Sequence, residues 1–298
     1  MIHLLRELSQ EAHELAGDCA VPRLHAPTAL DFLPYVAHSR PCIVTGVASQ
    51  WAASELWTDE YLCNTLGSSQ VRVNVTPDGR ADAVTNVLGR DVFVEPEESR
   101  MTFPEFLRLL QTSTDVAYVS AQNGNLHSDF ASVADDVPQA LEFATHCFGT
   151  EPDAVNIWIG DSRSVTTFHS DNYENVYAVI RGSKTLTLLP PWDVHRLRRA
   201  DVPVGRYIKD TNTGWRVALH GDVRIRWATA EPKDLGDGPP PLTVTLHAGD
   251  VLYLPALWAH HVCQTDGTIA VNWWHDMRYG SSYAMHRFLQ RLSDEMVK

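Results

Sequence analysis

Cysteine is scarce in this chain of 298 residues, and its five copies have no recognisable spacing. Their number is odd and no two form a CxxC pair, so the sequence favours neither a zinc site nor a secreted disulfide framework. No run of about 18 apolar residues occurs, and the N-terminus does not have the pattern of a signal peptide. We therefore expect no membrane span and a reducing compartment, the cytoplasm or the nucleus. The cysteines are Cys19, Cys42, Cys63, Cys147 and Cys263.

Positive charge is also in short supply. Lysine and arginine number 24 against 37 aspartates and glutamates, which gives a formal net charge of −13. The densest basic cluster covers residues 195–199 and is followed at once by Asp201. Direct contact with nucleic acid is therefore not expected. An acidic surface would suit a basic protein segment, and it would equally serve solubility alone.

Helical patterns dominate the first third of the chain, which has no internal repeat and no strong linker. Leu5, Leu8, Ala12 and Leu15 stand at helical spacing, and Gly17 follows as a stop signal. Further helices are expected at 29–39, 58–67 and 101–111, and a buried strand at 41–48.

From residue 116 the pattern changes to short β-branched and aromatic runs, separated by turns every 8 to 12 residues. Such runs are typical of a closed or double-sheet β architecture. Residues 232–241 are expected to form a surface loop, and a last helix is expected to place Tyr283, Phe288, Leu289 and Leu292 on one face. The predicted organisation is a single unit: an N-terminal helical and β region (1–115), a β core (116–278) and a C-terminal helix (279–298).

The polar stretch FHSDNYEN interrupts this β region. His169 and Asp171 are two residues apart, so in a strand both side chains lie on the same face. His260 and His261 follow far downstream, and at most one of these neighbours can face inward. Two histidines and one carboxylate form the facial triad of non-haem Fe(II) sites. Taken singly, each motif is weak, because a lone strand histidine is more often a structural residue.

Two further residues depend on backbone geometry. Lys184 opens a very apolar strand, where it either stays solvated at the turn or points inward and pairs with a carboxylate. Thr166 lies three residues before His169, so only a twist or a bulge would bring these two side chains to one face.

Long stretches of the chain resemble the JmjC family of Fe(II)- and 2-oxoglutarate-dependent oxygenases, and its small protein-hydroxylase branch in particular. They are VTPDGRADAV, PDAVNIWIGDSRSVTTFHSDNYENVY, AGDVLYLPALWAHHV and IAVNWWHDM. The resemblance covers nearly the whole chain and implies a double-stranded β-helix, the jelly-roll or cupin-like barrel, with helices at both ends. Asn172 and residues 195–241 match less well, so contacts at the substrate rim are expected to differ.

The resemblance also implies roles for individual residues. His169, Asp171 and His260 match the iron ligands, and Lys184 matches the residue that holds the distal carboxylate of 2-oxoglutarate. Trp258 and Trp273 either wall the site or are plain core residues. Tyr118, Thr166, Asn175 and Asn272 match the remaining cosubstrate contacts.

The implied reaction is oxygen-dependent hydroxylation of a protein side chain, most simply a lysyl residue of a GTP-binding protein, with release of succinate and CO2. The implied cofactors are Fe(II), 2-oxoglutarate and O2. A homodimer through the terminal helices, with Leu5, Leu8 and Phe288 as contacts, is a further expectation; packing on the chain's own barrel is the alternative.

Three other functions compete with this one. A methyl-lysine demethylase would use the same iron chemistry, although the chain has no Cys/His-rich reader module. An arginine- or lysine-directed endopeptidase could hold zinc and water, but HExxH and GxSxG are missing and Lys184 would be unexplained. A non-catalytic cupin-like binding module would not need an intact triad.

Overall fold

The computed structural model describes residues 2–16, 20–122, 124–210, 212 and 214–296, so Gly17 and Cys19 lie outside the described residues. The expected helices are confirmed, with ends set by caps. The Thr28 hydroxyl accepts from the Asp31 amide at the start of α2, and at the start of α5 the Thr102 amide donates to the Glu105 carboxylate at 2.8 Å. None of the described helices is long and apolar enough to cross a bilayer. The helices are α1 (Ile2–Ala16), α2 (Ala29–Ala37), α3 (Ala52–Leu56), α4 (Asp59–Leu66), α5 (Phe103–Thr112), α6 (Asn125–Ser128), α7 (Glu142–Phe148) and α8 (Ser281–Met296).

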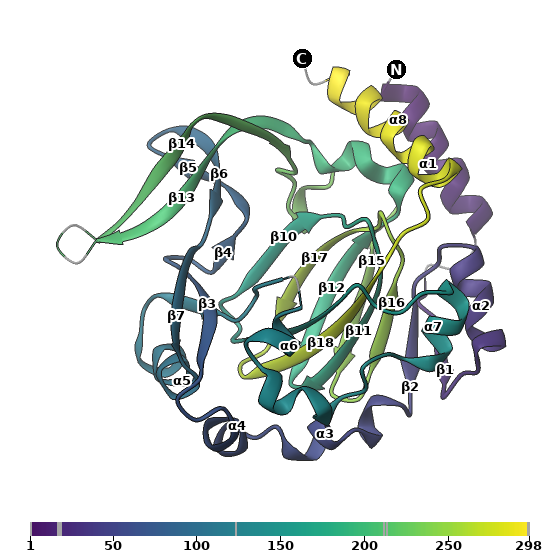
Figure 1. The fold of residues 1–298 in the computed structure, drawn as a ribbon. Coiled ribbons are helices and arrows are strands. Elements are labelled where there is room, and N and C mark those ends of the chain that lie inside the picture. The colour runs from purple at the N-terminus through teal and green to yellow at the C-terminus, as the bar shows by residue number, and fades with distance from the viewer. Residues whose placement is uncertain (1, 17–19, 123, 211, 213, 297–298) are drawn as a thin grey trace.

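Two β-sheets, antiparallel except where β1 joins β2 and β4 joins β10, form the centre of the molecule (Figure 1). One contains the strands β9, β18, β11 and β16 side by side, extended at one edge by β2 and β1, and the other contains β10, β17, β12 and β15, extended by β4. Apart from the neighbours β12 and β15, the strands from β9 to β18 that form these two sheets alternate between them along the chain. The architecture is therefore a jelly roll, the predicted double-stranded β-helix. The strands are β1 (Arg23–His25), β2 (Cys42–Thr45), β4 (Arg80–Ala81), β9 (Ala154–Gly160), β10 (Val165–His169), β11 (Tyr173–Arg181), β12 (Ser183–Leu189), β15 (Leu242–His247), β16 (Val251–Leu254), β17 (Ala259–Gln264) and β18 (Thr268–Asp276).

Strand β11 is apolar on both faces because both faces are covered. Val176 and Ala178 belong to the core beneath the helices, which also contains Phe32 of α2. Tyr177 and Val179 point the other way, into the core between the two sheets. This explains the almost unbroken burial of the strand, and it means that polar residues on its inner face lie inside the barrel.

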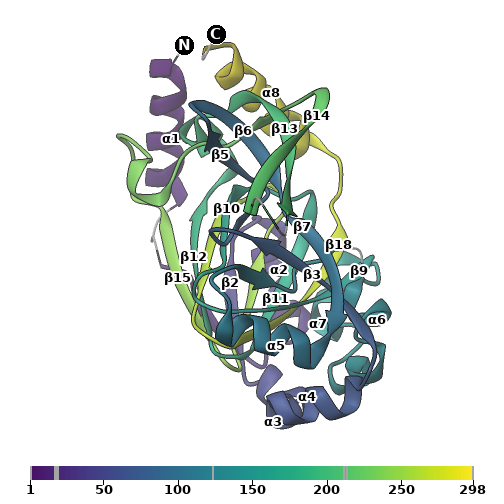
Figure 2. The same ribbon diagram turned by 90° about the vertical axis from the view of Figure 1, so that its left-hand side faces the viewer.

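A second layer of strands stands beside one mouth of the barrel (Figures 1 and 2). Val204 of β13 pairs in parallel with Phe93 of β6, so the loosely matching segment joins the N-terminal third of the chain in one sheet, ordered β14-β13-β6-β5. A smaller sheet has the order β7-β3-β8. These strands are β3 (Gln70–Thr76), β5 (Ala83–Val87), β6 (Arg90–Glu95), β7 (Glu97–Thr102), β8 (Val116–Tyr118), β13 (Ala200–Asp210) and β14 (Gly214–Trp227).

The first and last helices lie side by side (Figure 1). Leu5 of α1 and Leu289 of α8 are buried in one cluster with Phe168 of β10, so Leu5 packs on the chain's own barrel. The expectation that Phe288 shares the buried face of α8 is wrong. Phe288 is 59% exposed, because the buried face of the helix is formed by other residues. They are His286, Leu289, Gln290 and Ser293.

Candidate functional site

His169, Asp171 and His260 lie together at the mouth of the barrel. His169 ends β10 and His260 lies opposite it on β17, as Cα partners in the antiparallel ladder. The Nε2 atoms of His169 and His260 are 3.8 and 3.7 Å from one Asp171 carboxylate oxygen. One ligand atom from each of the three residues lies within 4.8 Å of the others. This donor set is the one that non-haem iron uses, and one ion can contact all three atoms.

Backbone carbonyls orient both imidazoles. The Nδ1 of His169 is 2.9 Å from the carbonyl oxygen of Thr167, and the Nδ1 of His260 is 3.0 Å from that of Trp258. Since a carbonyl can only accept, each Nδ1 carries the proton, and each Nε2 is left with a lone pair facing the other ligand atoms. Burial, and after it the His169 imidazole, lowers the pKa of His260 to about 4. His260 is therefore neutral at physiological pH, as a metal ligand must be.

A bulge in β10 brings Thr166 to the same site. Thr166 pairs with Val262 and His169 with His260, so three steps along β10 match two steps along β17. The extra residue changes the alternation, and Thr166 and His169 line the same pocket. The irregularity that the sequence required is present.

His261 faces away from the three ligand atoms. Its Nε2 is 3.7 Å from a carboxylate oxygen of Glu231, and its ring lies 5.6 Å from that of Phe168. Strand alternation alone could not choose between His260 and His261, and the structure brings His260 to the triad.

Lys184 points inward and is 1% exposed. Its Nζ donates a hydrogen bond of 2.8 Å to the Tyr118 hydroxyl and lies 5.4 Å from the centre of the Tyr177 ring. The carboxylate that a buried ammonium was expected to find is missing, since no acidic side chain of the described residues forms an ion pair with it. Burial consequently lowers the pKa of Lys184 to about 7. The pocket has a place for an anion.

A short amide chain lines the other side of this pocket. The Asn272 side-chain amide donates to the Asn175 oxygen at 3.0 Å, and the Trp158 indole N–H donates to the Asn272 oxygen at 2.8 Å. Both asparagines are buried. The interlocked hydrogen bonds fix which atoms each amide presents to the pocket.

All eight residues singled out in the sequence line this single inner pocket, between the triad and the Lys184 ammonium. Trp158, Gln122 and Trp274 line it too and were missed. Trp158 lies on the same face of β9 as Asn156 and Gly160, because these residues are two apart. Strand periodicity could therefore have predicted which face of β9 the Trp158 ring occupies. The eight are Tyr118, Thr166, His169, Asp171, Asn175, Lys184, His260 and Asn272.

Of the two roles that the sequence left open for Trp258 and Trp273, the structure supports the role of core residues. The Trp258 indole N–H donates to the carbonyl of Ser39, and the Trp273 indole N–H donates to that of Pro138. Trp273 of β18 belongs to the core beneath the helices, and Trp258, which precedes β17, belongs to the core between the two sheets. Neither ring lines the inner pocket.

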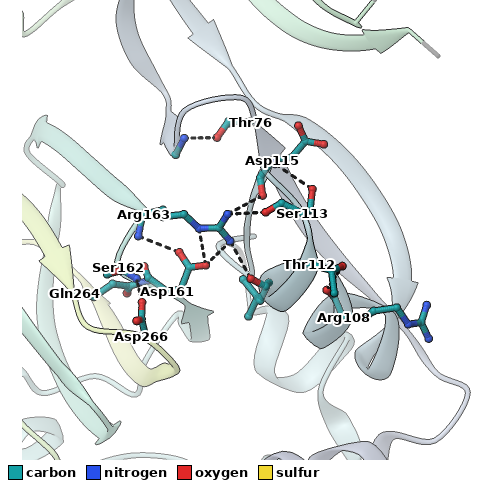
Figure 3. A network of polar contacts seen from close by, with 12 residues as sticks. Thr76, Arg108, Thr112, Ser113, Asp115, Asp161, Ser162, Arg163, Gln264 and Asp266 are labelled. Atoms are coloured by element: carbon teal, nitrogen blue, oxygen red, sulfur yellow. Dashed lines mark hydrogen bonds and ion pairs between the residues drawn. The ribbon is translucent and has the colours of Figure 1, made fainter. Parts of the chain in front are cut away.

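An arginine-centred network holds the wall that carries Tyr118 (Figure 3). The Arg163 guanidinium donates to the Asp161 carboxylate at 2.6 Å and to the carbonyls of Ser113 and Leu110 at 2.8 and 3.1 Å. These carbonyls belong to the end of α5 and the segment that leads into β8 (Figure 3). The network therefore ties the β9–β10 turn to the strand that positions the Tyr118 hydroxyl.

A cavity of about 760 Å³ opens outside the inner pocket and reaches His169 and Asp171. Carboxylates of Asp82, Glu95 and Glu98 line it, and so do the rings of Phe93 and Trp227. Solvent reaches Asp82 through the cavity, yet the surrounding walls bury its carboxylate enough to raise the pKa of Asp82 to about 6, with the Glu95 charge as the next cause. The cavity is the way from solvent to the triad.

Known proteins are similar to this chain over nearly its full length. The family described as "Cupin-like domain" matches residues 28–281. The chain is 38% identical to "Lysine-specific demethylase JMJ32" of Arabidopsis thaliana, over 97% of this chain and 91% of that protein. It is 36% identical to "Bifunctional peptidase and (3S)-lysyl hydroxylase JMJD7" of Homo sapiens, over 97% and 94%, and 33% identical to "JmjC domain-containing protein E" of Dictyostelium discoideum, over 95% and 92%.

Proposed function

Since the chain belongs to the JmjC family of cupin-like proteins, we propose that it is an Fe(II)- and 2-oxoglutarate-dependent oxygenase that hydroxylates a lysyl side chain of a protein. The observation that carries the proposal is the inner pocket, where a buried ammonium without an anionic partner faces a His-Asp-His cluster. A role in the fold alone does not explain the ammonium, because a buried charge without a counterion among the described residues costs stability.

The three ligand residues fit iron. The imidazoles of His169 and His260 and the carboxylate of Asp171 would hold the ion, a ligand set that suits non-haem Fe(II) in oxygenases. The carbonyls of Thr167 and Trp258 hold the imidazoles in the required tautomer before any metal arrives.

Lys184 and Tyr118 fit the far end of 2-oxoglutarate. The Lys184 ammonium would hold the far carboxylate of 2-oxoglutarate and would gain in it the anion that it lacks. The Tyr118 and Thr166 hydroxyls and the paired amides of Asn175 and Asn272 would supply neutral hydrogen bonds.

With both groups bound, the metal centre supplies the oxidation in which a substrate C–H bond, O2 and 2-oxoglutarate give C–OH, succinate and CO2. The chain's own contribution is placement. The β10 bulge brings Thr166 and His169 to one pocket, and the Lys184 ammonium would fix the direction of the cosubstrate.

A lysyl side chain is the proposed target for two reasons. One relative carries the name of a lysyl hydroxylase and another that of a lysine-specific demethylase, and both names concern lysine. The cavity that leads to the triad also carries more carboxylates than cations. GTP-binding proteins are the class in which we propose to look for the target first.

The test compares cells that carry the gene with cells that lack it, by mass spectrometry of their proteins. We expect lysyl sites 16 Da heavier in the presence of the wild-type protein and unmodified with Asp171→Ala. Oxygen-dependent formation of succinate by the purified protein should accompany them.

Each competing function gives a different result in the same experiment. A demethylase would release formaldehyde from methylated peptides and add no oxygen to unmethylated ones. A peptidase would cleave its substrate without 2-oxoglutarate, and a binding module would form no succinate with any substrate. Any of these results would contradict the proposal.

We also propose that the protein forms a homodimer through α1 and α8. Leu8 is 38% exposed and Phe288 is 59% exposed, and Leu4, Leu15 and Met285 add to this apolar surface. Light scattering should give twice the chain mass of 33.3 kDa, and Phe288→Asp should give a single chain. A wild-type protein that stays monomeric at all concentrations would contradict the homodimer proposal.

A further inference from the structure

The cavity outside the inner pocket contains a carboxylate without a partner. Glu95 is occupied, since the Arg206 guanidinium donates to it at 2.7 and 3.0 Å. Arg72, the other cation of the wall, is held by Asp129 at 2.8 Å. Within the described part of the chain, no side chain forms a hydrogen bond or ion pair with the Asp82 carboxylate, although the cavity walls surround it.

The backbone places Asp82 close to the triad. Strand β4 pairs in parallel with β10, with Arg80 opposite Val165 and Ala81 opposite Thr166. The next residue, Asp82, therefore stands beside Thr167, and the Thr167 hydroxyl is 3.5 Å from its carbonyl oxygen. His169 is two residues further along β10, roughly 7 Å at the rise of a strand.

The chain turns sharply at this point. Asp82 has a φ of +51°, a left-handed conformation between β4 and β5. Aspartate tolerates this conformation better than most residues but does not need it. Backbone conformations of this kind concentrate at binding sites, where the surrounding structure holds a side chain in a required place.

An aromatic surface lies in the same cavity. Phe93 and Trp227 pack edge to face with ring centres 4.8 Å apart, and both line the cavity with Asp82. A long aliphatic side chain with a charged end suits such a place, because its methylene groups can lie on the rings while the charge reaches a carboxylate.

We propose that Asp82 binds the positively charged end of the substrate side chain and so selects a cationic residue for the reaction at the triad. This inference rests on the proposed function, which makes the bound side chain a substrate. It concerns binding, however, and can be tested without turnover. Glu98 is the natural comparison. It lines the same cavity, carries the same charge and is exposed like Asp82, but it lies on β7, two strands away from Tyr118 in the sheet.

The experiment measures binding by the full-length protein, loaded with Fe(II) and 2-oxoglutarate and kept free of oxygen so that nothing is oxidised. Two pools of random peptides are offered, one with a central lysine and one with norleucine, which lacks only the ammonium group. Retained peptides are quantified by mass spectrometry. The variants are Asp82→Asn, which keeps the size of the side chain and tolerates the same backbone conformation, and Glu98→Gln as the control.

Wild type should retain the lysine pool about 10-fold or more over the norleucine pool, as expected for a charge-assisted hydrogen bond. Asp82→Asn should bring the ratio close to 1 with unchanged melting temperature and 2-oxoglutarate affinity, and Glu98→Gln should keep the wild-type ratio. The inference is overturned if Asp82→Asn keeps the preference, if both variants lose it equally, or if wild type shows none. If the preference depends on Asp82 but no succinate or hydroxylated product forms, the proposed reaction fails and the binding site stands.

Discussion

A single lysine reports most directly on what the inner pocket binds. Lys184 is fully buried, and within the described part of the chain its ammonium donates its hydrogen bond to a neutral phenol, so a charge on Lys184 has no counterion in the free protein. The fold stabilises the neutral amine, and the pKa falls from 10.5 to about 7. Such a residue is costly for stability and therefore indicates function.

This cost predicts a pH dependence. Between pH 7 and 10.5 the unfolded chain keeps the Lys184 proton and the folded chain releases it, so raising the pH stabilises the free protein. Relative to Lys184→Met, wild type should gain up to about 1.4 kcal/mol of unfolding free energy per pH unit in this range. Urea unfolding at several pH values measures the difference, and other titrating groups cancel between the two proteins. If the unfolding free energies of the two proteins change with pH in parallel, then burial does not lower the pKa of Lys184, and the prediction is wrong.

Individual site residues differed in how well the sequence predicted them. Asp171 and His169 follow from their spacing, because strand alternation acts locally. The choice of His260 over His261 depends on which side of β17 faces the barrel, and only the resemblance supplied it. Asp82 was not found, since its role depends on a left-handed turn and on a parallel pairing with β10 that no local pattern encodes.

At the level of elements, the contact between β9 and β8 sets the shape of the pocket. A Cβ atom on Gly160 would lie 2.6 Å from both Tyr118 Cδ2 and Gln264 Nε2, closer than real contacts allow. The strand therefore needs a residue without a side chain at its end, so that Tyr118 can reach Lys184.

Gly160→Ala should displace the Tyr118 ring and weaken binding of 2-oxoglutarate, with a loss of about 1–3 kcal/mol of stability from overpacking. Calorimetry with the metal-loaded, oxygen-free protein measures the affinity, and urea unfolding measures the stability. Gly280→Ala is the control, because a Cβ there meets nothing within 4 Å. Equal behaviour of the two variants would mean that β9 does not position Tyr118.

The sequence predicted the elements better than their connections. Helices at 29–39, 58–67 and 101–111 appear with ends within two residues, because capping and periodicity are local signals. The sequence showed that β10 needs an irregularity if Thr166 and His169 are to share a face, but it did not show that the irregularity is a bulge opposite β17. The parallel pairing of β13 with β6 joins residues more than a hundred positions apart, and neither strand has a sequence pattern that identifies the strand with which it pairs.

On the scale of the whole molecule, the site is assembled from distant parts of the chain. Strand β8 supplies Tyr118, the segment from β10 to β12 supplies the first two ligands and Lys184, and β17 supplies His260. The β5–β6 and β13–β14 hairpins add the outer cavity. This division separates an inner pocket, where the cosubstrate is proposed to bind, from an outer wall that can vary with the substrate.

The central claim is that the triad and Lys184 bind one metal–cosubstrate pair. The most direct measurement is a calorimetric titration of 2-oxoglutarate into the oxygen-free protein, with and without Fe(II). Wild type should bind 2-oxoglutarate strongly only with Fe(II). Asp171→Ala should lose the effect of the metal, and Lys184→Met should bind about 10- to 100-fold more weakly. Affinity that is independent of Fe(II), or that is unchanged in both variants, would contradict the account.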